Sequence, residues 1–232
     1  MSVSEKTQVK YRNEIKYLCS EAQIALLEMR IKHICRLDAH VAGVGAYEVR
    51  SVYFDDYADS CLLENIEGVN EREKMRIRIY DGDMNYIRLE CKQKRNGMNH
   101  KDSCRLTRQQ CDALLRGSCN EDDAAPELLK KLLLQMQTRL MRPKVIVQYN
   151  RVPYVFEQGN VRVTFDRDIA GSSHILDFEK KEIPMRRVLP VGYHIMEVKY
   201  DEFLPDFIRR ELQIPGLQHT AFSKYAMCRK SL

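Results

Sequence analysis

Apolar and charged residues alternate strictly along several parts of the chain. In the segment 73–80, EKMRIRIY, Met or Ile occupies every second position, and Lys74, Arg76 and Arg78 stand between them. Side chains of a β-strand point to opposite faces in turn, so this segment predicts a strand with one apolar and one cationic face. Five further segments alternate in the same way: 11–17, 47–51, 87–92, 161–166 and 196–200.

Six strands with a charged face are poorly explained by an open sheet, although one solvated face is common in antiparallel sheets. A closed antiparallel β-barrel explains them better, because closure removes the exposed edges and turns the charged faces into a lumen. The apolar faces would lie outside, under amphipathic helices. We therefore predict a closed barrel, or tunnel, with a charged lumen that holds a ligand, since unpaired buried charge is costly.

Helical spacing predicts five helices, which makes the fold class α+β. Ser20 and Thr107 each begin a capping box with Gln three residues later, and the second of these helices ends at Gly117. A third helix begins near Pro126 and carries leucines on one face as far as Leu140. Two short helices are expected at 205–212 and 220–229, and an acidic loop at 117–125.

Length and composition fit one soluble domain over residues 1–232. The chain has 38 Lys and Arg against 33 Asp and Glu, a mild positive surplus. It shows no signal-like start and no apolar run of about 18 residues, so we expect a cytoplasmic protein without a transmembrane segment. The eight cysteines include no C-x-x-C pair and are expected to be reduced and buried. The six histidines show no spacing typical of a metal site.

The charged strand faces together predict a strongly positive lumen. Its cations would be Arg12, Lys16, Lys74, Arg76, Arg78, Arg88, Lys92, Arg162 and Lys199, and its anions Glu14, Glu90, Asp166 and Glu197. Such cations suit a chain of phosphates, and the few carboxylates suit a divalent cation that bridges phosphate oxygens. The combination indicates metal-assisted phosphoryl chemistry. Internal salt bridges without a ligand would give the same composition, and this alternative stays open.

Eight segments, in order along the chain, carry a resemblance to a known family: YRNEIKY, SVYFDD, EKMRIRIYDGD, IRLECKQK, RPKVIVQYNRVPYV, VRVTFDRDI, IMEVKY and FSKY. Together they resemble the vacuolar transporter chaperone (VTC) domain, the polyphosphate polymerase branch of the triphosphate tunnel metalloenzymes. The resemblance runs from Tyr11 to Tyr225 and implies an antiparallel β tunnel. It further implies transfer of the ATP γ-phosphate to a growing inorganic polyphosphate chain, with Mn²⁺ or Mg²⁺.

The resemblance also implies roles for individual positions. Phosphate binding falls to Lys16, Arg76, Arg78, Lys92, Lys101, Arg151, Arg162, Ser223 and Lys224, with Arg105 as a further candidate. Glu197 is the implied metal ligand, with Glu14 as a second, and Tyr149 is implied as a nucleotide contact. The catalytic residues at the reacting phosphate would be Glu197, Lys199, Arg76 and Arg78.

Three features depart from the family pattern. Hydrolytic tunnel enzymes usually begin with Glu-x-Glu-x-Lys, whereas this chain has Arg12-x-Glu14-x-Lys16, which argues against plain triphosphatase action. Position 65 is Asn where the family often has a basic residue, so one phosphate contact is missing there. The regulatory and membrane modules of eukaryotic relatives are not visible, although a membrane-protein partner stays open.

Three functions remain open on the sequence alone. The first is an ATP-dependent, metal-dependent polyphosphate polymerase. The second is a non-catalytic module that binds polyphosphate, and the third is a tunnel-type triphosphate hydrolase. Nucleic acid is not an expected partner, because no platform of spaced aromatic residues accompanies the basic strands.

Overall fold

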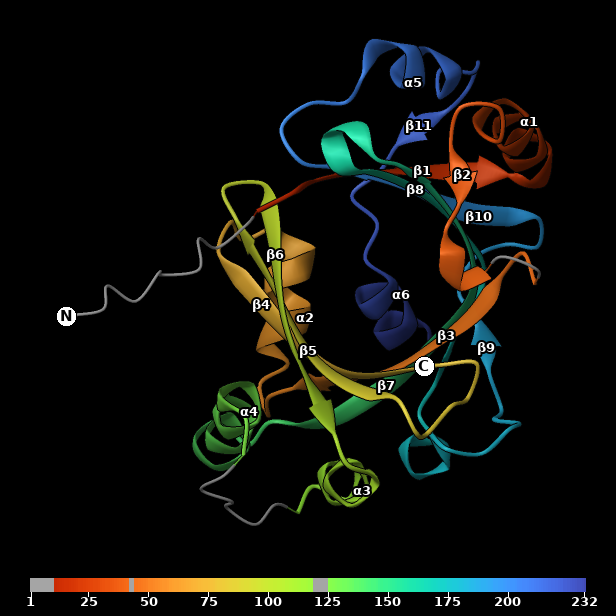
Figure 1. Cartoon of the computed structure of the whole chain (residues 1–232). Helices are drawn as coiled ribbons and strands as arrows, with labels where there is room; N and C mark the ends of the chain where they lie inside the picture. Colours follow the sequence, from red (N-terminus) through yellow and green to blue (C-terminus); the bar gives the residue numbers. More distant parts are fainter. Residues whose placement is uncertain (1–10, 42–43, 119–124) are drawn as a thin grey trace.

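The computed structural model describes residues 11–41, 44–118 and 125–232, and its main element is one large antiparallel sheet (Figure 1). In space the strands follow the order β11-β1-β10-β8-β7-β3-β4-β5-β6, with β2 beside β7 and β9 beside β8. The strands are β1 Asn13–Ser20, β2 Arg36–Leu37, β3 Tyr47–Asp55, β4 Arg72–Tyr80, β5 Ile87–Arg95, β6 Met98–Leu106, β7 Arg142–Phe156, β8 Val161–Ser172, β9 Arg186–Arg187, β10 Tyr193–Tyr200 and β11 Gln218–His219. All six alternating segments contribute to strands, as predicted.

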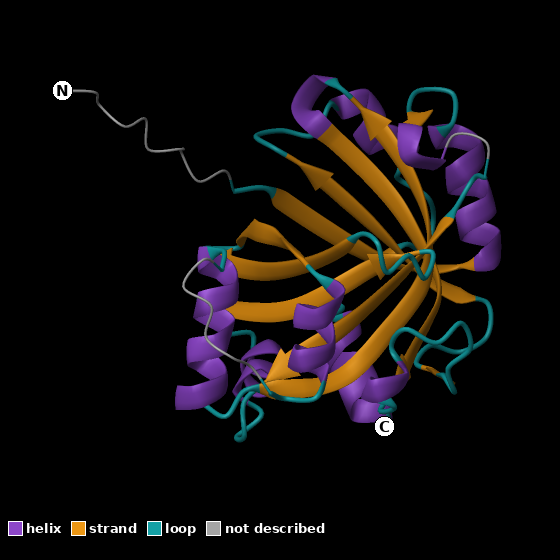
Figure 2. Cartoon of the chain, turned by 60° about the horizontal axis from the view of Figure 1, so that its bottom comes forward, coloured by secondary structure: helices purple, strands orange, loops and turns teal. Residues whose placement is uncertain are grey.

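The sheet curls on itself into a half-barrel, visible from the side in Figure 2. Within the described residues, one isolated bridge joins the start of β1 to β6. It consists of two backbone hydrogen bonds between Arg12 and Asn99, with N···O distances of 2.9 and 3.0 Å. The structure therefore confirms a strongly curved antiparallel sheet in an α+β fold, and full closure into a tunnel stays a prediction.

Six α-helices accompany the sheet in the described residues: α1 Glu21–Ile31, α2 Ser60–Glu67, α3 Arg108–Leu115, α4 Glu127–Thr138, α5 Asp206–Glu211 and α6 Lys224–Ser231. Three short 3-10 turns lie at η1 Ala39–Val41, η2 Gln158–Asn160 and η3 Ile175–Asp177. Both predicted capping boxes form, one at Ser20 with Gln23 and one at Thr107 with Gln110. Most of the acidic segment 117–125 lies outside the described residues, as does Cys119.

The helix α2 is absent from our sequence prediction, although Asp59 and Ser60 at its start are residue types that often cap a helix. Its N-cap residue Asp59 makes no capping hydrogen bond with its side chain. The free backbone N–H groups of the first turn donate instead to two carboxylates at the end of β3. Ser60 N–H donates to Asp56 at 2.9 Å, and Cys61 N–H donates to Asp55 at 2.9 Å. A strand end folded back onto the helix therefore replaces the local capping signal.

The apolar faces of the strands lie outside and are covered by helices, as predicted. α1 and α5 bury Ile24, Leu27 and Ile208 against the outer face of β8 and β10. α3 and α4 cover another part of the sheet, where Leu132 packs in one cluster with Ile77. Figure 1 shows both helix pairs on the convex side of the strands. This arrangement leaves the charged faces of most of these strands turned toward the concave side.

The last helix, α6, lies on the concave side of the sheet, within the curve of the strands (Figure 1). It begins at Lys224, later than the predicted residue 220, because Ser223 caps it and accepts a hydrogen bond from the N–H of Ala226. α6 approaches β8 closely at Gly171, where an added Cβ would lie 2.8 Å from the Cβ of Cys228. The ring of Tyr225 stacks on Tyr53 of β3, with centroids 5.2 Å apart.

The charged face of β3 points away from the concave side, contrary to prediction. Arg50 is 2% exposed, and its guanidinium donates to the side chain of Gln148 and to the backbone carbonyl oxygens of Phe178 and Lys180. The loop that follows β8 thus supplies acceptors for a buried cation on the outer face. The other face of β3 presents Ser51 and the tyrosines to the concave side.

The described cysteines are free thiols, and all but Cys104 are buried, as expected. No α-helix within the described residues has both the length and the apolar character to cross a membrane.

Candidate functional site

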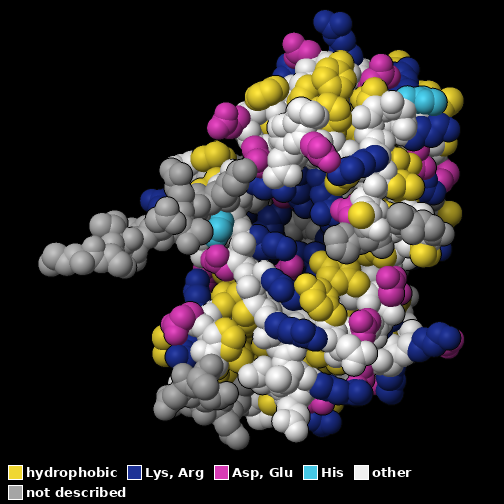
Figure 3. Space-filling model, in the orientation of Figure 1, with side chains coloured by type: hydrophobic (Ala, Val, Ile, Leu, Met, Phe, Trp, Pro, Cys, Tyr) yellow, Lys and Arg dark blue, Asp and Glu magenta, His cyan; other side chains and the backbone are white. Residues whose placement is uncertain are grey.

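A cavity of about 450 Å³ lies on the concave side of the sheet, and we call it the main cavity. Its lining comes from eight strands, from α6 and from the residues next to them: Arg12, Asn13, Glu14, Lys16, Tyr47, Tyr53, Lys74, Arg76, Arg78, Tyr80, Lys92, Asn99, His100, Lys101, Tyr149, Arg151, Arg162, Glu197, Lys199, Ser223, Lys224 and Tyr225. In Figure 3, Lys and Arg side chains gather around the hollow in the centre of the molecule. Eleven of the lining residues are Lys or Arg, and two are carboxylates.

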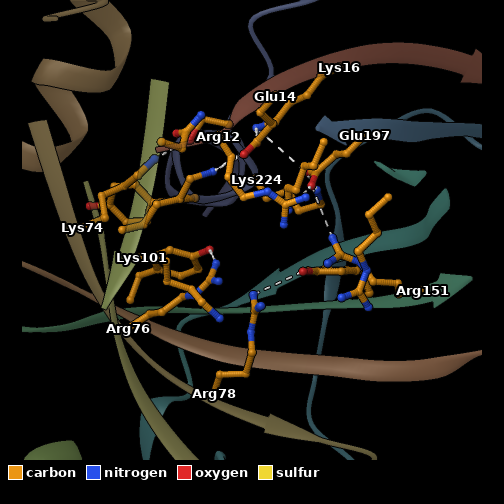
Figure 4. Close-up of a pocket in the computed structure, with 18 of the residues that line it drawn as sticks. Arg12, Glu14, Lys16, Lys74, Arg76, Arg78, Lys101, Arg151, Glu197 and Lys224 are labelled. Atoms are coloured by element: carbon orange, nitrogen blue, oxygen red, sulfur yellow. Dashed lines mark hydrogen bonds and ion pairs between the residues drawn. The ribbon is translucent and has the colours of Figure 1, made fainter. Parts of the chain in front are cut away.

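The strand β4 contributes a row of three cations to this cavity. Lys74, Arg76 and Arg78 alternate with Met75 and Ile77, which are fully buried on the opposite face. Figure 4 shows the three cations in a row along one side of the cavity. The strict alternation seen in the sequence therefore places these three charges in one wall.

Arg76 is held by one carboxylate and one phenol. Its Nε donates to Glu90 Oε2 at 2.8 Å, and its Nη1 donates to the hydroxyl of Tyr53 at 2.7 Å. Glu90 also pairs with Lys101 at 3.0 Å. Burial alone would raise the pKa of Glu90, but the neighbouring Arg76 and Arg78 hold it far below its usual value. Glu90 is therefore ionised and fixes the Arg76 fork in the cavity wall.

Arg78 is 5% exposed and is held mainly by hydroxyl groups. Its Nε donates to Ser51 Oγ at 2.9 Å, and its Nη2 donates to the hydroxyl of Tyr149 at 3.2 Å. Its distance to Glu90 Oε2 is 3.8 Å, which is a weaker ion pair. The charge of this guanidinium is thus only partly compensated by the protein, and an anion in the cavity would complete the compensation.

Opposite β4, a second group of charges joins β7, β8, β10 and α6. Arg151 makes a bidentate pair with Asp166, at 2.6 and 2.7 Å. Lys224 lies 2.6 Å from Asp166 Oδ2 and also pairs with Glu197 Oε1. Burial would lower the pKa of Lys224, but the two carboxylates raise it above its usual range. The same cations hold the pKa of Asp166 below its usual value against the effect of burial.

A third group joins the paired strands β1 and β10 to β5, which lies elsewhere in the sheet. Glu14 pairs with Lys92 at 2.7 Å and with Lys16 at 3.1 Å. Lys16 also lies 3.8 Å from Glu197, and Lys199 lies 3.3 Å from the same carboxylate. Burial raises the pKa of both carboxylates, but the surrounding ammonium groups hold both pKa values well below the usual range. The antiparallel register places Lys16 opposite Glu197, which explains why four charges from two strands interleave.

Comparison with known families decides the relationship of the chain. The model of the VTC domain matches residues 11–232. The chain belongs to the VTC domain family. No curated protein sequence is significantly similar to it.

Solved structures show that the fold of this VTC domain is shared more widely. A protein from Hippeastrum, described as a candidate adenylyl cyclase with a dominant triphosphatase activity, superposes with a TM-score of 0.53 at 16% identity, over 95% of this chain and 96% of that one. A candidate adenylate cyclase from Bacillus halodurans gives a TM-score of 0.50 at 12% identity, over 87% and 86% of the two chains. At such identities the likeness concerns the fold.

Most residues to which the sequence assigned roles meet in the main cavity of the VTC domain, from Glu14 and Lys16 near the start to Lys224 in α6. The predicted lumen anions Glu90 and Asp166 pair with lining residues. Arg88, predicted as a lumen cation, is not among the lining residues and donates to Ser103 Oγ instead. Arg162 lies at its rim, 2.9 Å from Asp38 and 3.4 Å from the hydroxyl of Tyr47. Arg105 is also not among the lining residues, because it is exposed and donates to the backbone carbonyl of Asn85 outside the cavity. The roles of these residues stay predictions, although their common location supports them.

Sequence reasoning missed the aromatic part of the lining. Tyr47, Tyr53 and Tyr225 contribute hydroxyl groups and ring faces, and Arg151 lies over the ring of Tyr149 with its guanidinium carbon 5.1 Å from the centroid. The face of Tyr53 was predictable, since Tyr53 lies two residues after Ser51 in β3 and therefore shares its strand face. The alternation of charged residues predicted instead that the charged face of β3, which carries Arg50, would line the lumen.

The carboxylates of the VTC domain fit a divalent cation only together with a phosphate ligand. Within the described residues, no group of three or more His, Cys, Asp or Glu side chains could hold a metal ion. Glu14 and Glu197 converge on the ammonium group of Lys16, at 3.1 and 3.8 Å. Mg²⁺ is commonly held by one or two carboxylates plus substrate phosphates, so this donor pair suits a cation that arrives with a nucleotide.

Proposed function

We propose that this VTC domain is a cytoplasmic polyphosphate polymerase that transfers the γ-phosphate of ATP to an inorganic polyphosphate chain, with the curved sheet closing around the chain as a tunnel. One observation carries the proposal: eleven Lys and Arg side chains from distant strands converge on one cavity that contains two carboxylates. Solvated surface charges would not converge in this way. A linear polyanion of phosphates matches both the charge and the elongated row of cations along β4.

In the proposed reaction the terminal oxygen of the polyphosphate chain attacks the γ-phosphorus of ATP. The new P–O bond forms as the bond from the γ-phosphorus to the β,γ-bridging oxygen breaks, and ADP leaves. No protein nucleophile is required, so the protein acts by positioning and by charge compensation. Arg76 and Arg78 would hold the transferring phosphate from one wall, and Lys199 would hold it from the other.

The remaining candidates would bind the rest of the ligand. Lys16, Lys92, Lys101, Arg151, Arg162, Ser223 and Lys224 would bind phosphates along the cavity. Tyr149 would contact the nucleotide beside Arg151. Glu197, with Glu14, would hold Mn²⁺ or Mg²⁺, which when bound neutralises charge on the phosphate oxygens.

A chain-growth assay tests the proposal. The protein is incubated with ATP and either Mn²⁺ or Mg²⁺, and the products are separated on a gel that resolves polyphosphate lengths. We expect a ladder of growing chains from the parent and none from Glu197→Gln. Glu127→Gln is the matched control, since Glu127 is the same residue type with a 91% exposed side chain outside the cavity lining and should leave growth unchanged. The absence of polymer with either metal would refute the polymerase.

A polyphosphate-binding module is the second candidate, and the ion pairs favour it. Both oxygens of Glu197 face lysine or arginine nitrogens, so the carboxylate is already compensated without a metal. This function predicts tight binding of polyphosphate without chain growth from ATP. A triphosphate hydrolase, the activity described for the Hippeastrum protein, would instead release free phosphate without polymer.

A further inference from the structure

A second basic cavity of about 520 Å³ adjoins the main one. Six lining residues are common to both cavities: Glu14, Lys16, Lys74, Lys92, Asn99 and Ser223. The second cavity further contains Arg72, Lys94 and Lys230 and no carboxylate other than Glu14. A ligand that extends from one cavity into the other must therefore pass this shared group of residues.

Lys74 differs from the other lysines of the main cavity in its partners. Lys16, Lys92, Lys101, Lys199 and Lys224 each pair with at least one carboxylate. Lys74 has no carboxylate within ion-pair distance among the described residues. Its Nζ donates instead to two neutral oxygens, Asn65 Oδ1 at 2.7 Å and Ser223 Oγ at 3.5 Å.

The amide of Asn65 is fixed so that its oxygen faces Lys74. Its Nδ2 donates to the backbone carbonyl of Cys61, one turn earlier in α2, at 2.8 Å. Backbone N–H groups of the first turn of α2 donate hydrogen bonds to Asp55 and Asp56 at the end of β3, which fixes the position of the helix. Asn65 therefore holds the ammonium of Lys74 in place without neutralising its charge.

Most of the charged groups around Lys74 are cations. Lys16 and Glu14 face it from β1, Lys92 from β5, Arg72 and Arg76 from its own strand, and Asn65, Ser223 and Tyr225 from the helices. Burial, together with Lys92, Lys16, Arg72 and Arg76, lowers the pKa of Lys74 well below its usual value. An anion beside Lys74 would offset the desolvation and the repulsion between cations that lower this pKa. No carboxylate of the described residues lies within ion-pair distance to do so.

We propose that Lys74 is a phosphate-binding residue at the junction of the two cavities, and that Asn65 positions its ammonium group. The ligand class is a linear polyphosphate that extends from the main cavity into the second one. The inference rests on the proposed function only in that the site binds polyphosphate, whether or not it polymerises. The neutral side chain of Asn65 then orients the ammonium group of Lys74 on β4.

The first test compares the affinity of inorganic tripolyphosphate for the parent, Lys74→Met and Lys130→Met, measured without metal. Lys130 is an exposed lysine of α4 that pairs with Glu127 outside both cavities. We expect Lys74→Met to weaken binding about tenfold, because one charged contact to phosphate is lost. Lys130→Met should leave the affinity unchanged. Unchanged affinity of Lys74→Met would overturn the inference, while a parent that does not bind tripolyphosphate would also refute the proposed function.

The second test measures proton uptake from the heat of tripolyphosphate binding in two buffers that differ in ionisation enthalpy, at several pH values between neutral and the usual pKa of a lysine. Phosphate binding should raise the pKa of Lys74, so the parent should take up more protons than Lys74→Met. Asn65→Asp supplies the missing carboxylate, so it should keep Lys74 protonated, lower the proton uptake and weaken binding. Parent-like uptake and affinity of Asn65→Asp would show that Asn65 does not act through Lys74.

Thermal unfolding separates this role from a structural one. Lys74→Met deletes a half-buried cation that has no carboxylate partner among the described residues, so its midpoint of unfolding should equal or exceed that of the parent. Loss of stability in Lys74→Met, together with retained affinity, would make Lys74 a structural residue and overturn the proposal.

Discussion

Replacement of Glu197 by glutamine tests how the charges of the main cavity are coupled. Glutamine keeps the size of the side chain, so the change removes a charge without opening a cavity. Glu197 lies beside four cations: it pairs with Lys224, and lies 3.3 Å from Lys199, 3.5 Å from Arg151 and 3.8 Å from Lys16. Lys224 and Arg151 keep Asp166 as a partner, and Lys16 keeps Glu14. Within the described residues only Lys199 loses its single carboxylate partner.

The magnitude follows from this pattern of partners. Removing one member of a buried ion pair costs about 3–5 kcal/mol when the other member is left uncompensated. Because three of the four cations retain a partner, we expect a smaller loss of about 2 kcal/mol in the free energy of unfolding. The same change removes a repulsion against phosphate, which for two unit charges about 4 Å apart amounts to about 4 kcal/mol at an effective dielectric constant of about 20. After screening by the neighbouring cations, we expect tripolyphosphate to bind at least about tenfold more tightly without metal, or about 1.4 kcal/mol.

The two effects oppose each other, and one pair of assays measures both. Urea unfolding of the parent and Glu197→Gln, with and without saturating tripolyphosphate, gives the stability difference in each state. The deficit of about 2 kcal/mol should shrink to about 0.6 kcal/mol with ligand, because tighter binding adds its gain to the folded state. Glu127→Gln, at an exposed position of α4, serves as the control and should show neither effect. A variant with parent stability and parent affinity would show that Glu197 is not coupled to the cavity charges, and the site as described would be wrong.

Four further predictions concern salt, pH and packing. Affinity for long-chain polyphosphate should fall steeply between low and physiological salt, by analogy with counterion release from nucleic acid, and a flat dependence would argue against the cavity as the binding site. Burial lowers the pKa of Lys92 to about 8, so tripolyphosphate affinity should decrease as the pH rises above 8, and titration calorimetry of Lys92→Arg should show a flatter decrease. The pKa values of Glu14 and Asp166 are lower in the folded than in the unfolded chain, so both carboxylates stabilise the fold at neutral pH. The free energy of unfolding should therefore drop as the pH falls below about 4, and a constant denaturation midpoint there would contradict the ion-pair assignment. Gly171→Ala should destabilise the protein by about 1–3 kcal/mol and weaken tripolyphosphate binding, because the new Cβ would lie 2.8 Å from the Cβ of Cys228 and displace α6. An unchanged midpoint of urea unfolding would show that the structure accommodates the added methyl group.

The sequence by itself determined the strands, most of the helices and the cationic wall of the cavity. These are local properties: a period of two fixes which side chains share a strand face, and a capping box fixes where a helix begins. The row Lys74, Arg76 and Arg78 was therefore visible before any fold was known. The ordered motifs added the family and the set of residues that meet in the main cavity.

The tertiary structure decided which partners these residues have. Arg50 alternates with apolar residues as Arg76 does, but a distant loop supplies carbonyl acceptors for it on the outer face, so the two cations have opposite roles. The start of α2 depends on carboxylates at the end of β3, and the pairing of Lys74 with Asn65 depends on that helix. Such contacts join groups from separate elements, and no local pattern encodes them. The sequence therefore specifies which charges share a strand face. The folded sheet specifies which of these faces is concave and which of the charges remain uncompensated for a ligand.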